Sequence, residues 1–268
     1  MSQVPVTVII LAAQRTGVVN PLAERAGVSH KCLVPICGRP LVEYVMETIT
    51  TLPAIKAIRV VLEPEGQQDV DKVLEPFRAR GIAVDLIDSD PNIVESVIAA
   101  SKGEEGPFII TTADNVLLTQ AGFEQMRDAL GKTDAALGLA AREQVLSAHP
   151  EGQRRFYQLR DAGYANCNIY ALANRKAFAA AETFREGGQF MNNPGRLVRA
   201  FGLFNILLMK LKLVSIKGAM RRISRRFGVE IEAVVFADGG LAIDVDNERT
   251  LSICEQLLPI RRPTDIRA

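Results

Sequence analysis

Apolar runs alternate with segments of helical periodicity through the first half of the chain. The runs, rich in β-branched residues, predict five strands, at Val6–Ala12, Ala57–Leu62, Ile82–Ile87, Phe108–Thr112 and Asp134–Ala140. Helices are expected after the first four strands, near residues 40–51, 67–80, 92–102 and 119–130. Because the runs are continuously apolar, we expect strands buried on both faces. The predicted fold class is therefore α/β: a three-layer sandwich with a mostly parallel, Rossmann-like sheet.

The pattern changes in the second half of the chain. Arg155–Arg160 and Tyr164–Leu172 flank an Asp-Ala-Gly turn and predict an antiparallel hairpin. Two helices are expected over residues 196–227, divided near residues 214–216. Two strands and a last helix should follow, at Ala233–Phe236, Leu241–Val245 and 247–258. No repeat and no Pro/Gly/Ser-rich linker divides the chain. We expect one domain over residues 1–268, in which 141–268 adds a small hairpin and helical insertion to the sheet of 1–140.

Composition excludes several classes of protein. The 268 residues are 48% hydrophobic and 24% charged, as in ordinary globular proteins, and the net charge of +1 argues against a nucleic-acid-binding protein. No apolar stretch approaches the roughly 20 residues of a membrane-spanning helix. Val4–Ala13 lacks a basic leader and a cleavage motif, so it predicts a strand rather than a signal peptide. The four cysteines form no Cys-x-x-Cys pair, which favours reduced core thiols and a cytoplasmic location.

The first loop after a strand carries the clearest candidate chemistry. Ligands of open α/β sheets bind beyond the carboxyl ends of the strands. Here the small residues Ala12 and Ala13 allow a ligand to approach the backbone, and Arg15 and Lys31 offer it two cations. A polyphosphate suits such a loop, and a long loop with solvated charges is the alternative. The loop has neither the Gly-x-Gly-x-x-Gly pattern of dinucleotide-binding proteins nor a Gly-Lys-Ser/Thr phosphate-binding loop.

The stretch from Val8 to Val45 resembles the amino-terminal signature of nucleotidyltransferases with a glycosyltransferase-A-type fold. That signature is Leu-Ala-Ala-Gly, a basic residue, and then Lys-x-Leu with a later Gly-(Arg/Lys)-Pro-(Leu/Met); Gln14 stands where the superfamily has glycine. The Gln14-Arg15 pair, with Asn20–Ala23, is similar to a subgroup like molybdenum-cofactor guanylyltransferase whose acceptor is unassigned. The resemblance implies that the first loop binds the nucleotide and that its two cations, Arg15 and Lys31, are catalytic. The implied nucleotide-binding residues of the loop are Leu11, Ala12, Ala13, Gln14, Arg15 and Lys31.

The resemblance also implies a reaction. A nucleoside monophosphate would pass from a nucleoside triphosphate, with CTP or GTP favoured, to a phosphorylated sugar, polyol or small alcohol, and pyrophosphate would leave. Two alternatives remain open. One is glycosyl transfer from a nucleotide sugar, although such enzymes usually carry Asp-x-Asp where this chain has Asp114-Asn115-Val116. The other is a non-catalytic nucleotide-binding regulator, which the departure at Gln14 motivates.

Three aspartates are candidate ligands of Mg²⁺. Asp114 follows a predicted strand, and a carboxylate beside phosphates suits this ion; capping of the next helix is the alternative. The segment Thr111–Thr119 is similar to the second motif of the superfamily. In a strand, Asp244 and Asp246 would share one side, although Asp246 also stands where a helix cap is expected. The superfamily often ends in a similar Ile-Asp-Val-Asp, which favours Asp246 over Asp244.

Four polar residues are candidates for recognition of the two substrates. Asn92 and Ser96, near a predicted helix start, are candidates for the nucleotide base, with helix capping as the alternative role of Asn92. Asn166 and Asn168 share one face of the hairpin and suit acceptor hydroxyls, unless they satisfy local backbone.

Residues 196–226 hold nine Lys or Arg and no acidic residue, so this segment carries +9 and the rest of the chain −8. A basic surface that rests on anionic lipid is one interpretation. A solvated helix face that covers the core is the favoured one.

Overall fold

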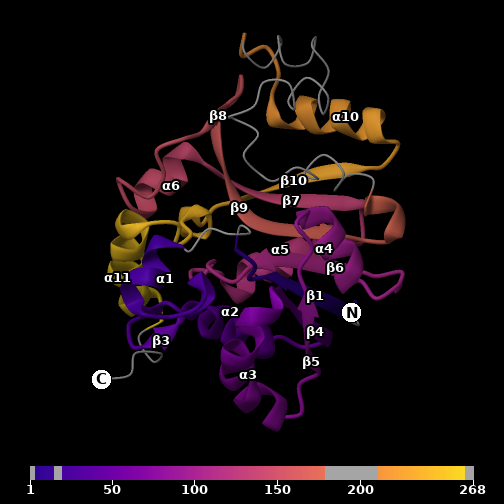
Figure 1. The fold of residues 1–268 in the computed structure, drawn as a ribbon. Coiled ribbons are helices and arrows are strands. Elements are labelled where there is room, and N and C mark those ends of the chain that lie inside the picture. The colour runs from indigo at the N-terminus through magenta and orange to yellow at the C-terminus, as the bar shows by residue number, and fades with distance from the viewer. Residues whose placement is uncertain (1–3, 15–19, 179–210, 263–268) are drawn as a thin grey trace.

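The computed structural model describes residues 4–14, 20–178 and 211–262. Its centre is an eight-stranded mixed sheet in the order β10-β7-β9-β6-β1-β4-β5, with β8 paired to β9 (Figure 1). The strands of this sheet are β1 (Val6–Leu11), β4 (Ile55–Leu62), β5 (Val84–Asp88), β6 (Phe108–Thr112), β7 (Ala135–Ala141), β8 (Tyr157–Gln158), β9 (Gly163–Leu172) and β10 (Ile231–Phe236). The mostly parallel α/β sheet predicted from the sequence is confirmed.

The helices form a layer on each face of the sheet. The described helices of six or more residues are α1 (Pro21–Ala26), α2 (Leu41–Thr50), α3 (Pro64–Ala79), α4 (Ile93–Ala100), α5 (Gln120–Ala129), α6 (Arg142–Ala148), α10 (Ile216–Phe227) and α11 (Glu248–Arg261). Alternate residues of β1 face opposite layers: Val8 packs in the cluster that contains α2, α3, α5 and α11, whereas Ile9 packs with α4. Both faces of β1 are therefore buried, as its apolar run predicts.

The predicted hairpin contributes far more to the sheet than expected. Its first strand, β8, has only two residues, but its second, β9, lies between β6 and β7 and runs antiparallel to both. Polar Asn166 and Asn168 alternate on β9 with Cys167 and Ile169, which are fully buried. Because β9 is central, its polar residues stand close to the carboxyl ends of the parallel strands.

The predicted strand Leu241–Val245 is wrong. Residues Gly239–Ala242 form a short 3-10 helix, η5, and the chain continues from Ile243 without strand pairing. The reason is close packing, since a Cβ atom at Gly239 would lie 2.1 Å from the backbone of Gln144 in α6. The glycine lets η5 contact α6 directly, in a way that an ordinary strand residue does not allow.

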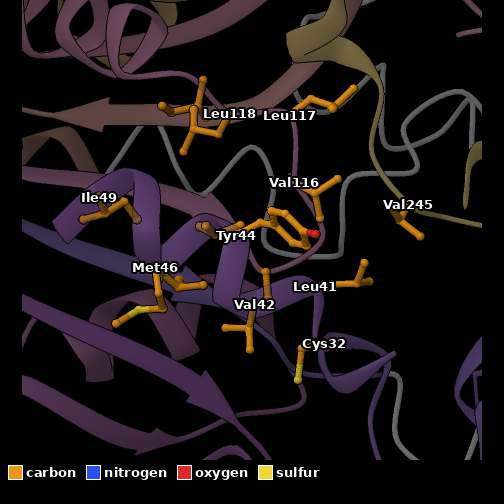
Figure 2. Packing of buried hydrophobic residues seen from close by; sticks show 14 of the residues in the cluster. Cys32, Leu41, Val42, Tyr44, Met46, Ile49, Val116, Leu117, Leu118 and Val245 are labelled. Carbon is orange, nitrogen blue, oxygen red and sulfur yellow. The ribbon is translucent and has the colours of Figure 1, made fainter. Parts of the chain in front are cut away.

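Several short elements escaped the sequence analysis. These are α1, the 3-10 helix η1 (Lys31–Leu33), the two-stranded pair β2 (Pro35–Ile36) and β3 (Arg39–Pro40), and α6. The first four fold the long first loop back against α2, where apolar side chains form the cluster drawn in Figure 2. In that view Cys32 and Leu41, from the loop and the start of α2, lie in the same cluster as Val116 and Val245. This packing joins the first loop to the segments that follow Asp114 and Asp244.

The basic segment is described only in part, because residues 196–210 lie outside the described residues. Its last helix, α10, packs against β10 through buried Ala219 and Met220, so its apolar side is covered by the protein itself. No helix within the described ranges has the length and apolar character needed to span a bilayer. The packing of α10 agrees with the favoured interpretation, a helix face that covers the core, and contact with anionic lipid is not supported.

Candidate active site

The carboxyl ends of β1 and β6 meet the segment that follows η5. The backbone N–H of Ala113 donates to the carbonyl oxygen of Leu11 over 2.9 Å, and that of Val245 donates to the carbonyl oxygen of Asp114 over 3.2 Å. Three segments far apart in the sequence are therefore held together by main-chain bonds. The geometry that the candidate site requires, Asp114 and Asp246 at one edge of the sheet, is present.

Lys31 lies between the two aspartates. It is the first residue of η1, and its ammonium group pairs with the carboxylate of Asp114 and, over 3.1 Å, with Oδ1 of Asp246. Burial of the ammonium lowers the pKa of Lys31, but the two carboxylates together raise it more, so the pKa lies above its ordinary value. Lys31 is thus held as a cation at the point where the three segments meet.

Neither Asp114 nor Asp246 is a helix cap. Thr119 caps α5, and its side chain accepts from the N–H of Gly122, so Asp114 is not needed there. Asn247 caps α11, in a capping box with Thr250. Because the cap falls on Asn247, the Asp246 carboxylate remains directed at Lys31, and its side chain is 57% exposed. The capping roles left open by the sequence are excluded for both aspartates.

Asp244 has surroundings unlike those of Asp246. It is 5% exposed, and its Oδ2 accepts a 2.7 Å hydrogen bond from Nδ2 of Asn168 on β9. Burial raises its pKa well above the ordinary value, and the nearby carboxylates of Asp246 and Asp114 raise it further. Since the segment is not a strand, the alternation that would place Asp244 and Asp246 on one side does not apply.

The two predicted acceptor residues form a chain of hydrogen bonds that leads to Asp244. Asn166 donates from Nδ2 to Oδ1 of Asn168 over 2.7 Å and to the Tyr170 hydroxyl over 2.5 Å. Asn168 adopts a left-handed backbone conformation, with φ of 47°, and it donates in turn to Asp244. Both asparagines are therefore engaged within the protein, and contact with an acceptor stays a prediction.

The carboxylate oxygens fit a hard divalent cation. Oδ1 of Asp114 and Oδ1 of Asp244 are buried and have no hydrogen-bond partner, which leaves oxygen acceptors available at the site. Across the described ranges, no group of three or more His, Cys, Asp or Glu is arranged to hold a metal ion by itself. Mg²⁺ does not need such a group, because it binds through one or two carboxylates together with substrate phosphates. Asp114 and Asp246, which both contact Lys31, stay the predicted ligands of Mg²⁺, and Asp244 stays the third candidate.

The first loop has a feature that the sequence analysis missed. Glu63, which lies between β4 and α3, accepts a 2.8 Å hydrogen bond from the backbone N–H of Gln14 through Oε1. The side-chain amide of Gln14 donates to the carbonyl oxygen of Ser29 over 3.1 Å. Glu63 directly follows a strand at this same edge, and that position was the available signal. Of the loop, Ala12 is buried and Ala13 exposed, whereas Arg15 lies outside the described residues.

Asn92 and Ser96 lie at the start of α4, after β5, at the edge of the sheet that carries the ends of β1 and β4. Asn92 caps α4 by accepting from the N–H of Val94. Ser96 is 3% exposed, and its hydroxyl oxygen accepts from the N–H of Asp90 over 2.8 Å. Both side chains thus stabilise the loop before α4, and neither forms a hydrogen bond with Lys31, Asp114, Asp244 or Asp246. Their role in base recognition stays a prediction.

Comparison with known families decides the class of protein. Residues 8–191 match the model of the MobA-like NTP transferase domain, and this stretch covers more than half of the chain. The chain belongs to this family. It is a nucleotidyltransferase, with the class of activity that the signature in the first loop implies. A search of curated proteins found no significant match.

Solved structures give the same fold. A hypothetical transferase from Thermus thermophilus is 25% identical, with a TM-score of 0.74 over 92% of this chain and 99% of that one. The 4-diphosphocytidyl-2C-methyl-D-erythritol synthase of Anaerococcus prevotii is 12% identical, with a TM-score of 0.60 over 95% and 98%. The inositol-1-phosphate CTP transferase of T. maritima is 11% identical, with a TM-score of 0.59 over the whole of both chains. The glycosyltransferase-A-type fold implied by the resemblance is confirmed.

Proposed function

We propose that this nucleotidyltransferase joins the nucleoside monophosphate of CTP or GTP to the phosphate of a small phosphorylated sugar, polyol or alcohol, with release of pyrophosphate and with Mg²⁺ as cofactor. The observation that carries the proposal is the placement of Lys31 between Asp114 and Asp246. One cation and two carboxylates at the carboxyl edge of an α/β sheet suit a metal-bound triphosphate. CTP is the first candidate, since two proteins of similar fold are named for cytidylyl or CTP transfer.

The chemistry needs no general base. A phosphate monoester loses its second proton near pH 6, so an oxygen of the acceptor phosphate is already ionised at neutral pH. This oxygen forms a bond to the α-phosphorus of the triphosphate. The bond between the α-phosphorus and the bridging oxygen breaks, and its electron pair leaves with pyrophosphate. What the protein supplies is alignment of the two substrates and stabilisation of negative charge.

Each residue of the site then has a defined part. Asp114 and Asp246 would hold Mg²⁺, which neutralises charge on the phosphate oxygens. Lys31, held as a cation by the two carboxylates, stabilises the charge that grows at the α-phosphate. Arg15 is proposed to act beside it, from the first loop. Asp244 and its bonded partner Asn168 position the segment that carries Asp246.

The experiment is a pyrophosphate-release assay of purified protein with Mg²⁺, each of the four nucleoside triphosphates, and a panel of sugar and polyol phosphates. Pyrophosphate release that depends on the acceptor supports the proposal. Hydrolysis of nucleotide sugars without triphosphate turnover would indicate glycosyl transfer instead. Triphosphate binding without turnover, with every acceptor tried, would indicate a regulator. Lys31→Met is the matched loss-of-function variant, because it keeps an unbranched side chain of similar size and removes the ammonium group.

A further inference from the structure

A cavity of about 570 Å³ lies beside Asp246, between the chain after α6 and the start of α11. This volume falls in the range of pockets that bind small molecules. Three arginines line it, together with Asp246: Arg154 and Arg155 from the chain before β8, and Arg249 from the first turn of α11. None of these arginines was singled out by the sequence analysis, because no motif marks them.

The arginine-bearing chain is fixed against the site rather than lying loose on the surface. Gln153 donates from Nε2 to the carbonyl oxygen of Ala242 over 2.9 Å. A Cβ atom at Gly152 would lie 2.6 Å from the Ile243 side chain, so the backbone there approaches the segment just before Asp244. Arg249 donates to the carbonyl oxygen of Glu151 and ties the same chain to α11. The cavity and the metal candidates are therefore parts of one packed unit.

The lining of the cavity holds three arginines and two carboxylates, those of Glu151 and Asp246, so its net charge is positive and suits an anion. Arg154, which is 69% exposed, has only a loose ion pair with Glu151, at 3.8 Å. A second cavity of about 550 Å³ continues the surface, shares Arg154 and Arg155, and adds Arg142. The basic surface thus begins at Asp246 and extends away from it. An ionised phosphate that approaches a triphosphate is repelled by it, and guanidinium groups along its path offset that repulsion.

We propose that the cavity beside Asp246 is the acceptor site, and that Arg154, Arg155 and Arg249 bind the phosphate of the acceptor. This inference rests on the proposed function, since it supplies the second substrate of that reaction. The position is suitable for transfer, because Asp246 lies both in the wall of the cavity and in contact with Lys31. The acceptor is thereby a small phosphate monoester, bound mainly by its charged end, and neutral alcohols or polyols are excluded as substrates.

The test compares Arg154→Ala, Arg249→Ala and their double variant with the wild-type enzyme at saturating nucleotide. Arg221→Ala, on the exposed side of α10, is the matched control, because it removes an arginine that lines neither cavity. We expect the KM for the acceptor to rise about tenfold in each single variant, and further in the double variant. The Kd for the nucleotide should stay within about twofold in all of them. Melting temperatures report whether each variant is folded.

An unchanged acceptor KM in the folded double variant overturns the inference and leaves the proposed function intact. Equal losses of nucleotide and acceptor affinity also overturn it, because the arginines would then serve the triphosphate. If the wild-type enzyme releases no pyrophosphate with any acceptor, the proposed function fails, and binding of glycerol 3-phosphate measured by NMR decides on the cavity alone. Binding that the double variant loses supports an anion site there, and no binding by the wild-type protein at millimolar concentration contradicts one.

Discussion

The backbone N–H of Val245 donates a 3.2 Å hydrogen bond to the carbonyl oxygen of Asp114. Asp114 is one candidate metal ligand, and Val245 directly precedes the other, Asp246. This bond therefore sets how far apart the main chains of the two ligands lie. Val245 is fully buried, and the core packing that surrounds it, drawn in Figure 2, holds the bond in place. The spacing of the two carboxylates is thus a property of the folded backbone rather than of flexible side chains.

Asp114→Ala should keep the fold and abolish turnover. Loss of one of two carboxylates at a charge-neutralising site is expected to lower kcat by about 10³-fold. Asp128→Ala is the control, because Asp128 is an exposed aspartate on the neighbouring helix α5. Steady-state pyrophosphate release and thermal melting are measured together. If the melting temperature drops and the residual activity is proportional to the folded fraction, Asp114 has a structural role instead.

Thr250→Val should weaken both the start of α11 and the metal site. The Thr250 hydroxyl accepts from the N–H of Asp246 over 2.8 Å and from that of Asn247 over 3.1 Å. Loss of these capping bonds should cost about 1 kcal/mol in the free energy of unfolding. Because the Asp246 backbone is also released, we expect half-maximal activity to require a higher Mg²⁺ concentration. Thr250→Ser keeps the hydroxyl and should restore both quantities, and a Mg²⁺ requirement unaltered in Thr250→Val would contradict the link.

Glu104→Gln should destabilise the protein in a pH-dependent way, far from the site. Glu104 pairs with buried Arg59 and, over 3.0 Å, with Lys56. Burial raises the pKa of Glu104, but the bonds from Lys56 and Arg59 outweigh this and lower the pKa below its ordinary value. A lowered pKa stabilises the folded state above the pKa of the unfolded chain, and the stabilisation is lost as the pH falls through the folded value.

Urea unfolding at pH 7 and at pH 3.5 measures this effect. At pH 7 we expect Glu104→Gln to lose about 1–3 kcal/mol, because Arg59 keeps its buried charge without a counter-ion. At pH 3.5 the difference between variant and wild type should shrink. A difference that is independent of pH would show that packing, and not the ion pair, accounts for the loss.

The sequence predicted the elements whose pattern is local. β1 and β6 are continuous apolar runs, and strands of this kind are buried in any parallel α/β sheet. Asp114 was found for the same reason, since it follows β6 and the ends of parallel strands meet at one edge. Asp246 was found from the resemblance of Ile243–Asp246 to the end of the superfamily. The elements that were predicted wrongly depend on contacts between segments distant in the sequence. η5 forms because Gly239 packs on α6, and β9 is central because β6 and β7 both accept it as a partner.

Some residues of the candidate site could not be predicted from the sequence, because they too come together only through contacts between distant segments. Glu63 contacts the first loop through the N–H of Gln14 and through His30, and its position after a strand does not by itself predict these two contacts. Arg154 and Arg249 face one cavity although they come from different elements. Isolated arginines are ordinary surface residues, and only the fold distinguishes those that share a cavity with Asp246.

The most direct measurement is the fate of the phosphates of labelled CTP and GTP, incubated with enzyme, Mg²⁺ and a phosphorylated acceptor. The account predicts that label in the α-phosphate appears in the acceptor product, whereas label in the γ-phosphate leaves as pyrophosphate. Lys31→Met should abolish both. Transfer of the γ-phosphate to the acceptor, or release of orthophosphate with the α-phosphate left in free nucleotide, would contradict the account.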